Sequence, residues 1–206
     1  MAKAICGWAH SKASPDRNPF VPPIPLADLT AGQYAAQSAV FAVFDREMST
    51  GSEGQVIDIG LYEPLFRLFI GRPEAYDTME YVDDRTGNRS NNSAPRNIYK
   101  TSDGHLALSA SSQRIFENVI EALGREELID DPRFETNADR LKHVDELDSI
   151  IQEWTRKRST EKTIDVLEKS DAIVGPIKDI SDIFDDEQYD ERDNLVSIDD
   201  PDLGSV

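Results

Sequence analysis

The fold is decided by the stretch Asn97-Ile98-Tyr99-Lys100-Thr101-Ser102-Asp103-Gly104-His105-Leu106-Ala107-Leu108-Ser109-Ala110. Its centre, Asp103-Gly104, is a strong signal for a tight turn between antiparallel strands. After the turn, Leu106 and Leu108 alternate with small residues, as a half-buried strand requires. We therefore predict a β-hairpin with strands at 97–101 and 105–110.

Segments with the spacing of amphipathic helices follow the hairpin. Ser112 is placed to cap a helix whose apolar residues recur every three or four positions and which ends at Gly124. A second helix is predicted around 141–154 and a third from Thr160, and residues 171–177 indicate a further strand. Short helical pieces and a strand at 194–198 are expected after them. The pattern predicts an α+β fold in which helices outnumber strands.

The chain before the hairpin changes character several times. Residues 1–27 are predicted to form an extended linker, because four prolines between residues 16 and 25 disfavour both helix and central strand. A helix rich in small residues is predicted from Asp28, its N-cap, to about residue 50. A strand at 55–59 and a short helix at 61–70 should follow. The polar, aperiodic residues 72–96 are expected to form a long loop, and loops of this length are often functional.

The charge of the chain excludes one class of partner. Forty acidic residues stand against 22 basic residues, which gives a formal net charge of −18. Such a chain repels phosphate backbones, so we expect no nucleic-acid partner. The acidic residues are spread along the chain, and arginine is preferred over lysine. We interpret this as a halophilic, acidic surface, since high salt screens the repulsion between like charges.

The sequence also argues against membranes, disulfides and metals. Its apolar runs are far shorter than the roughly 20 residues of a membrane span, and no secretory signal is visible, so a cytoplasmic location is expected. Cys6 is the single cysteine, which excludes an internal disulfide. The three histidines lie on unrelated predicted elements, and the acidic residues after Asp179 lack the spacing of an EF-hand. We therefore predict no metal site and interpret residues 179–202 as a solvated acidic face.

An ordered series of short motifs runs from residue 26 to about residue 200. The most specific member is Asp131-Pro132-Arg133-Phe134, which follows Leu123-Gly124. The other members are Asp28 with its small-residue helix, Arg46-Glu47, Thr50-Gly51, Gly54-Gln55-Val56-Ile57-Asp58-Ile59, Arg85-Thr86-Gly87-Asn88, Tyr99-Lys100-Thr101-Ser102-Asp103-Gly104, Arg140, Trp154 and Val174-Gly175-Pro176. This order resembles the family III CoA-transferases, also called the CaiB/BaiF family.

The resemblance implies a fold and a reaction. Members of the family have a large Rossmann-like lobe built from both ends of the polypeptide and a small α+β lobe between them, and two chains interlock as a homodimer. By this comparison residues 28–71 belong to the large lobe and linker, 72–178 form the small lobe, and 179–206 form an acidic return linker. The family transfers CoA from an acyl-CoA to a carboxylic acid through an aspartate nucleophile. Acyl-CoA and an acid are the implied substrates, with no covalently bound cofactor.

The same comparison sets the candidate site residues. The nucleophilic aspartate of the family matches no residue of this chain, so no catalytic residue is assigned, and Asp28 is given a structural role. Many members carry a flexible glycine-rich loop that closes over the reacting carboxylate. The matching loop is rich in asparagine, which tolerates positive φ. The candidates for a substrate-contacting role are Asn88, Arg89, Ser90, Asn91, Asn92 and Arg96.

Three functions stay open on the sequence. The chain is expected to be inactive alone and to work as part of a larger or split CoA-transferase, as a homodimer or with an N-terminal half of the same enzyme. A 2-methylacyl-CoA racemase-like fragment is the second reading, because racemases occur in the family. A non-catalytic remnant or interaction domain is the third, favoured by the apolar helix at 29–44.

Overall fold

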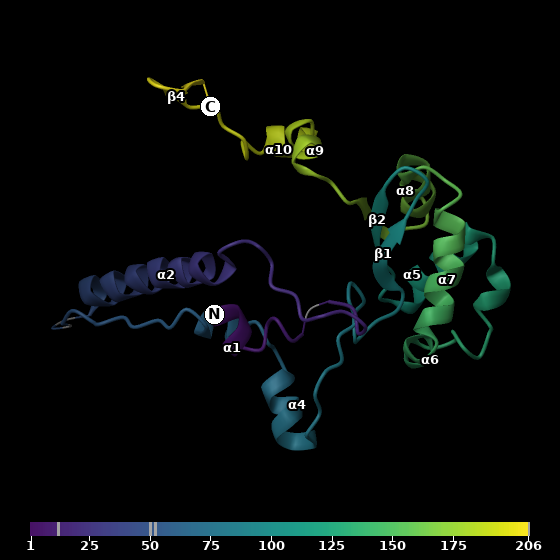
Figure 1. The fold of residues 1–206 in the computed structure, drawn as a ribbon, viewed down its shortest axis with the longest axis horizontal. Helices are drawn as coiled ribbons and strands as arrows, with labels where there is room; N and C mark the ends of the chain where they lie inside the picture. The colour runs from purple at the N-terminus through teal and green to yellow at the C-terminus, as the bar shows by residue number, and fades with distance from the viewer. Residues whose placement is uncertain (12, 50, 52, 206) are drawn as a thin grey trace. The chain divides into compact units, whose positions relative to one another are not determined.

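The computed structural model describes residues 1–11, 13–49, 51 and 53–205. The chain divides into two compact units, Met1–Asn91 and Asn92–Val206, whose elements are labelled in Figure 1. The described part of the first unit is helical, whereas the second combines helices with a sheet. The chain is thus a mixed helix-and-sheet protein, as predicted.

The second unit is built on a three-stranded antiparallel sheet of order β1-β2-β3. Strand β1 is Arg96–Lys100, β2 is His105–Ser109 and β3 is Ile173–Pro176. Tyr99 is directly opposite Leu106, and Leu108 lies between Asn97 and Val174. The predicted hairpin and the strand at 171–177 are therefore confirmed. Alternation places Tyr99, Leu106 and Leu108 on the buried face, and His105 is exposed, as the pattern of strand side chains requires.

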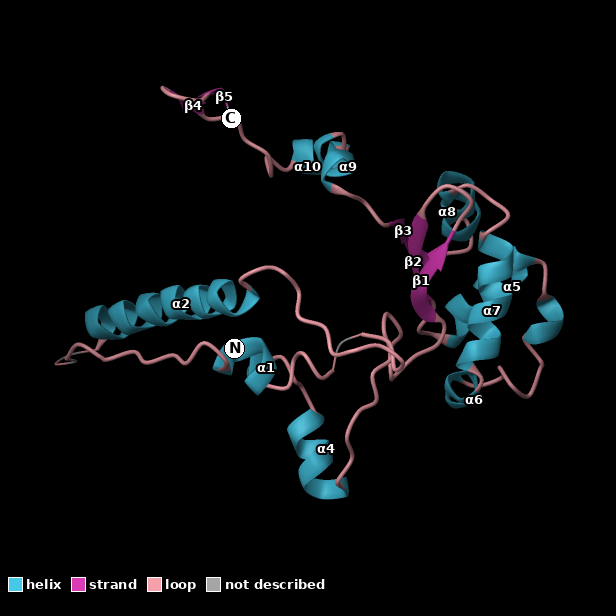
Figure 2. Cartoon of the chain, viewed as in Figure 1, coloured by secondary structure: helices cyan, strands magenta, loops and turns pink. Residues whose placement is uncertain are grey.

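Helices cover one face of this sheet (Figure 2). They are α5 (Gln113–Leu123), η1 (Glu126–Leu128), α6 (Asn137–Lys142), α7 (Val144–Thr155) and α8 (Thr160–Glu168). The Ser112 hydroxyl accepts a hydrogen bond from the Ile115 amide, and Gly124 ends α5 with a φ of +69°, which only glycine adopts without strain. Both caps were predicted. The helix expected at 141–154 is interrupted at His143, which separates α6 from α7.

The core of the second unit lies between the sheet and these helices. Its fully buried side chains come from β1, β2, α5, α7, α8 and the Asp-Pro-Arg-Phe motif, namely Tyr99, Leu106, Leu108, Phe116, Val119, Ile120, Phe134, Leu147, Ile151 and Leu167. Trp154 is half-buried against this core, in keeping with its predicted packing role. Burial of these side chains on one helix face and one sheet face explains the periodicity seen in the sequence.

The hairpin turn is fixed by the start of α8. The Asp103 carboxylate accepts hydrogen bonds from the Thr160 amide at 2.8 Å and the Thr160 hydroxyl at 2.9 Å. A Cβ added at Gly104 would lie 3.1 Å from Thr160 Oγ1, so a larger residue would disturb this contact. These hydrogen bonds hold the pKa of Asp103 below its usual value.

The residues that the structure describes in the first unit form the helices α1 (Ala2–Ile5), α2 (Leu26–Met48), α3 (Glu63–Arg67) and α4 (Arg72–Met79). Its small buried cluster joins Cys6, Ala27 and Leu65, and Trp8 packs on Phe69 with ring centroids 6.0 Å apart. The predicted linker 1–27 is irregular over the proline-rich residues, and Lys3 Nζ donates to the carbonyls of Pro22 and Ile24. Helix α1 was not predicted.

Four expectations about helices and strands were wrong. Helix α2 begins at Leu26, so Asp28 lies in its first turn and makes no cap; a carboxylate is favoured there by the helix dipole. Residues 55–59 form no strand, since no described segment pairs with them. Part of the long loop expected at 72–96 is helix α4, which starts with Pro73 at its second position, a favoured place for proline. Residues 194–198 are not a strand either.

The acidic segment after β3 carries only short elements. These are α9 (Ile180–Phe184), α10 (Glu187–Glu191) and a two-residue pairing of β4 (Asp199–Asp200) with β5 (Gly204–Ser205). Asp179 caps α9 through a capping box with Asp182, and Lys178 pairs with Asp186. Many of these acidic residues serve as helix caps or first-turn residues, which is a structural use of the charge.

The Asp-Pro-Arg-Phe motif is an ion-paired turn over the core. Asp131 accepts hydrogen bonds from the Arg133 amide at 2.9 Å and from the Arg133 guanidinium at 2.6 Å, and the same guanidinium reaches Glu146 at 2.5 Å. The Phe134 side chain is fully buried. The hydrogen bonds from Arg133 lower the pKa of Asp131 from 3.8 to about 2. The motif thus connects the η1 turn to α7 on one side and inserts Phe134 into the core on the other.

We predict that Asp131→Asn weakens the second unit at neutral pH and flattens its response to acid. Because the folded-state pKa of Asp131 is depressed, its contribution to stability is complete above its ordinary pKa of 3.8 and is lost as the pH falls toward about 2. Urea unfolding followed at a series of pH values checks this. Asp130→Asn removes the neighbouring carboxylate and is the control. If the free energy of unfolding falls equally steeply with decreasing pH in Asp131→Asn and in the unchanged chain, the lowered pKa of Asp131 does not contribute to stability.

Candidate functional site

The candidate loop spans the boundary between the two units. Asn88, Arg89, Ser90 and Asn91 belong to the first unit, and Asn92 and Arg96 belong to the second. The side chains of Asn88, Asn92 and Arg96 are exposed, and those of Arg89, Ser90 and Asn91 are half-buried.

Within the first unit, the loop begins on the N-terminal segment. The Gly87 amide donates to the Ala13 carbonyl at 3.1 Å, and Arg85 Nη2 donates to the Pro15 carbonyl at 3.0 Å. The Thr86 hydroxyl donates to the Arg89 carbonyl at 3.0 Å, and the Arg89 amide donates to the Thr86 carbonyl at 3.2 Å, which closes a small turn. The beginning of the loop is therefore fixed by two backbone hydrogen bonds and by the side chains of Arg85 and Thr86, which donate to backbone carbonyls.

Within the second unit, helix α6 holds the end of the loop. The side-chain amide of Asn137 donates to the Asn92 carbonyl at 2.9 Å and accepts from the Ala94 amide at 3.1 Å. Arg140, one turn further along α6, donates from Nε to the Ala94 carbonyl at 2.8 Å. The Ala94–Pro95 peptide bond is cis. The backbones of Asn92 and Ala94 are thus bound by two side chains of one short helix.

Arg140 is the best-buried charged residue of the described chain, with 1% of its surface exposed. Its Nη1 donates to the Phe134 carbonyl at 2.9 Å and to Gln113 Oε1 at 2.8 Å, and its guanidinium lies 4.1 Å from the centroid of the Phe116 ring. Burial lowers the pKa of this guanidinium, and the charges of Glu117 and Asp139 oppose that effect. The Arg140 guanidinium therefore contacts the loop end, the Asp-Pro-Arg-Phe motif and helix α5.

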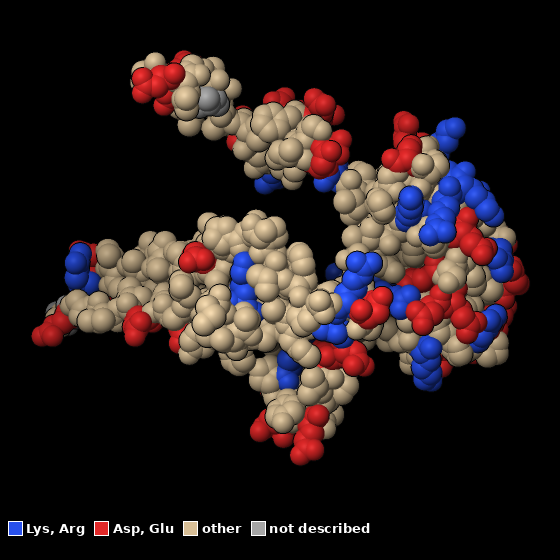
Figure 3. Space-filling model, viewed as in Figure 1, with Lys and Arg blue, Asp and Glu red and all other residues tan. Residues whose placement is uncertain are grey.

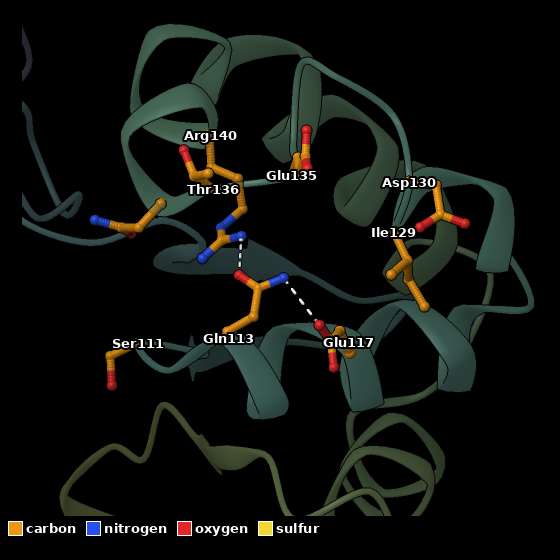
Figure 4. Close-up of a pocket in the computed structure, with 9 residues that line it drawn as sticks. Ser111, Gln113, Glu117, Ile129, Asp130, Glu135, Thr136 and Arg140 are labelled. Carbon is orange, nitrogen blue, oxygen red and sulfur yellow. Dashed lines mark hydrogen bonds between the residues drawn. The ribbon is translucent and has the colours of Figure 1, made fainter.

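A pocket of about 570 Å³ opens beside this arrangement (Figure 4). Gln113 lies next to Arg140, from which its Oε1 accepts a hydrogen bond, and it links Arg140 to Glu117, to which Gln113 Nε2 donates at 2.9 Å. The lining residues come from the α5 start, the η1 end and α6, namely Ser111, Gln113, Glu117, Ile129, Asp130, Glu135, Thr136, Asn137 and Arg140. Asn137 and Arg140 are shared by the pocket and the loop anchor, so any displacement of the loop end is transmitted to the pocket wall.

The chemistry of this site is that of a polar binding surface. Three acidic residues, Glu117, Asp130 and Glu135, line this pocket together with the buried Arg140 and several residues with amide or hydroxyl groups. Among the residues that the structure describes, no three acidic, histidine or cysteine side chains gather in a way that could hold a metal ion. No helix in the described ranges combines the length and apolar character of a membrane span.

Sequence reasoning found part of this site. The loop residues were chosen by resemblance, and Arg140 was a member of the motif series, but its contact with the loop was not foreseen. Asn137 was missed entirely. An asparagine following Thr136 at the start of a helix gives only the signal of a helix cap, and its pairing with residues more than 40 positions away is visible only in the fold.

Comparisons with known proteins agree with one another. The sequence profile described as CoA-transferase family III matches residues 1–206. The succinyl-CoA–D-citramalate CoA-transferase of Chloroflexus aurantiacus is 34% identical over 207 residues, which is 100% of this chain and 51% of that protein. The beta subunit of succinyl-CoA–L-malate CoA-transferase from the same organism is 30% identical over 209 residues, 100% of this chain and 51% of the relative.

The solved structures point the same way. A CaiB/BaiF family protein from Brucella suis superposes with a TM-score of 0.77 at 28% identity, covering 97% of this chain and 52% of that one. The chain therefore spans about half the length of the curated relatives and of the solved structure that it matches.

We predict that Arg140→Met destabilises the second unit by about 3 kcal/mol, because the Ala94 and Phe134 carbonyls lose their buried donors. Trp154 fluorescence during urea unfolding measures this in a Trp8→Phe background, where Trp154 is the one tryptophan left. Arg133→Met, which removes a side chain that is 45% exposed, is the matched control and should cost clearly less. Equal losses for the two variants would show that the buried contacts of Arg140 contribute no more than a surface ion pair.

Proposed function

The chain belongs to CoA-transferase family III, and we propose that it supplies the small α+β lobe of an enzyme that moves CoA from an acyl-CoA to a carboxylic acid. The family match over residues 1–206 is the observation that carries this proposal. We further propose that the acids are short dicarboxylates, because the two relatives compared above are named for succinyl-CoA with D-citramalate or L-malate.

We propose that a second half-enzyme completes the active site. The chain spans about half of its relatives, and these include separate subunits. Helix α2 supports the need for a partner: only Ala27 and Ala31 of its 23 residues are buried, while large apolar side chains on several sides are exposed within the first unit. These are Leu29, Tyr34, Val40, Phe41, Val43, Phe44 and Met48. A helix that is apolar on several sides requires cover by protein.

In the proposed reaction, an aspartate carboxylate of the complementary half attacks the acyl thioester, and the thiolate of CoA leaves. The resulting anhydride is attacked by that thiolate at the aspartyl carbonyl, which releases the donor acid and leaves an aspartyl-CoA thioester. The acceptor carboxylate repeats the two steps in reverse order. Water would destroy the anhydride, so the role proposed for the loop from Asn88 to Arg96 is to close over it.

Reconstitution tests this proposal. In a first experiment the chain is co-expressed with the N-terminal half of the succinyl-CoA–D-citramalate CoA-transferase. In a second experiment a chimera is made in which this chain replaces the matching half of that transferase. Light scattering first establishes assembly, and chromatography then follows succinyl-CoA and the new CoA ester with several dicarboxylic acids. We expect transfer by the assembled enzyme and none by the chain alone.

Two other outcomes identify the alternatives. Epimerisation of a 2-methylacyl-CoA without exchange between acids would favour the racemase reading. A stable complex in both arrangements, with neither transfer nor epimerisation, would contradict the enzyme and favour an interaction domain.

We predict that Arg96→Ala in the assembled enzyme raises KM for the acceptor acid about tenfold with a small change in kcat. Arg96 is the exposed cation at the loop end, and one charge-assisted hydrogen bond to a carboxylate accounts for a change of this size. Arg125→Ala, which removes an exposed arginine already paired with Glu127, is the control. An unchanged KM for the acceptor acid would show that Arg96 does not contact its carboxylate.

A further inference from the structure

The pocket beside helix α6 contains a hydrogen-bond donor that the protein leaves unused. Arg140 lines this pocket, and its Nε and Nη1 donate to the Ala94 and Phe134 carbonyls and to Gln113. Nη2 donates to no residue in the part of the chain that the structure describes. In that same part, every side-chain nitrogen or oxygen that is shut off from solvent has a hydrogen-bond partner. Solvent therefore reaches Nη2, although only 1% of the surface of Arg140 is exposed.

Acidic residues from three segments line the same pocket. Glu117 lies on α5, Asp130 follows η1, and Glu135 precedes α6. The Glu117 carboxylate accepts a hydrogen bond from Gln113, whereas the side chains of Asp130 and Glu135 form neither a hydrogen bond nor an ion pair with a described residue. These three negative charges stand against the one positive charge of Arg140, which leaves the lining with a net charge of −2.

The charges around the pocket do not reverse this balance. The charge of Asp139 also acts on Arg140, but its carboxylate is engaged by Lys142 at 3.0 Å and by the Thr136 hydroxyl at 2.5 Å. Basic and acidic side chains are mixed over the face of the second unit that is visible in Figure 3, so surface charge alone does not single out a site. The pocket differs from that surface because it combines an unpaired, buried donor with carboxylates on several segments.

We propose that this pocket binds a small basic amino acid, with its carboxylate on Nη2 of Arg140 and its ammonium groups against the acidic lining residues. A guanidinium nitrogen with free N–H groups requires an acceptor, and a carboxylate gives the strongest such hydrogen bond. An ammonium group supplies three donors and the positive charge that the carboxylates lack. The volume of about 570 Å³ is within the range of small-molecule pockets. The inference goes beyond the proposed transfer of CoA and does not rest on it.

The charges of the lining disfavour ligands of a single sign. A dicarboxylate satisfies Nη2 of Arg140 but meets three carboxylates, whereas a diamine satisfies the carboxylates and leaves Nη2 without an acceptor. A molecule with both groups satisfies both parts of the pocket. One ammonium group in excess of the carboxylate reduces the residual charge of the lining from −2 to −1, and the net charge of −18 on the whole chain favours the approach of a cation.

Binding in this pocket acts on the end of the loop through shared residues. Asn137 and Arg140 line the pocket, and they also hold the backbone of Ala94, whose amide donates to Asn137 Oδ1 at 3.1 Å and whose carbonyl accepts from Arg140 Nε at 2.8 Å. A carboxylate on Nη2 restrains the guanidinium that holds this carbonyl. We therefore expect the hydrogen bond of the Ala94 amide to open less often when the ligand is bound, which slows the hydrogen exchange of that amide.

A titration of the isotope-labelled 206-residue chain with L-lysine, followed by NMR, tests the inference. We expect saturable shifts of the backbone amides from Gln113 to Glu117, slower exchange of the Ala94 amide, and binding that weakens as salt is raised. Two molecules of matched length each lack one of the two groups: cadaverine has no carboxylate, and hexanoate has no ammonium group. Each should bind at least about tenfold more weakly than L-lysine, the equivalent of one lost charge-assisted hydrogen bond.

Two variants locate the contacts. Glu117→Gln should weaken binding of L-lysine at least about tenfold, because it removes one carboxylate of the lining. Glu121→Gln makes the same change of charge one turn further along α5, at an exposed residue that does not line the pocket, and should have little effect. Arg140→Lys keeps the positive charge without Nη2 and should bind L-lysine and cadaverine equally. If Arg140→Lys fails to fold, the ligand series and Glu117→Gln decide the question.

Three results would overturn the inference: no saturable shift with L-lysine, binding of cadaverine or hexanoate as tight as that of L-lysine, or equal losses in Glu117→Gln and Glu121→Gln. The proposed function is tested separately. If the reconstituted enzyme transfers CoA and the chain binds no L-lysine, this site is refuted while the function stands. If the chain binds L-lysine through Glu117 and no transfer is restored, the site stands without the function.

Discussion

Burial of the Arg140 guanidinium is the constraint on which the second unit depends. A charge removed from water is costly unless its hydrogen-bonding groups find partners. In the described part of the chain its hydrogen-bond partners are two backbone carbonyls and an amide oxygen, with an aromatic ring beside them, and Glu117 and Asp139 act on it through their charge alone. The positive charge is thus retained locally, and three segments distant in sequence must be in place together to satisfy it. This explains how residues 92–95 are held in one position although they belong to no helix or strand.

The elements that could be predicted from sequence are those specified by local chemistry. The hairpin follows from Asp103-Gly104 and from the alternation of Leu106 and Leu108, and α5 follows from its caps at Ser112 and Gly124. Residues 55–59 have the composition of a strand but have no partner, and a strand exists only through pairing. Asp28 has the chemistry of an N-cap, yet packing of Ala27 and Ala31 starts the helix earlier. Local propensity is therefore a weak guide wherever tertiary contact decides the boundary.

The candidate site also has a part that the sequence located and a part that only the fold reveals. Resemblance located the loop, because the order of motifs is a property of the sequence. The groups that hold it, Asn137 and Arg140, contact residues 43 to 46 positions away, and no local pattern encodes that separation. The pocket depends on the fold in the same way, since its wall combines α5, η1 and α6. The net charge of −18 did not show how charge is distributed, because a sum over the whole chain gives no position for the basic residues.

The net charge of −18 acts over distances that salt can shorten. The Debye length is about 3 Å at 1 M ionic strength, so the field of a distant carboxylate is screened at that salt concentration. A contact at hydrogen-bond distance is about as long as that screening length, so it is weakened less than an interaction between charges several times farther apart. The same reasoning assigns a different role to Arg140, whose charge is buried and so is insulated from salt at any concentration. Raising the salt concentration therefore weakens exposed ion pairs such as that of Arg133 with Glu146, and it leaves the buried contact of Arg140 with the loop end unchanged.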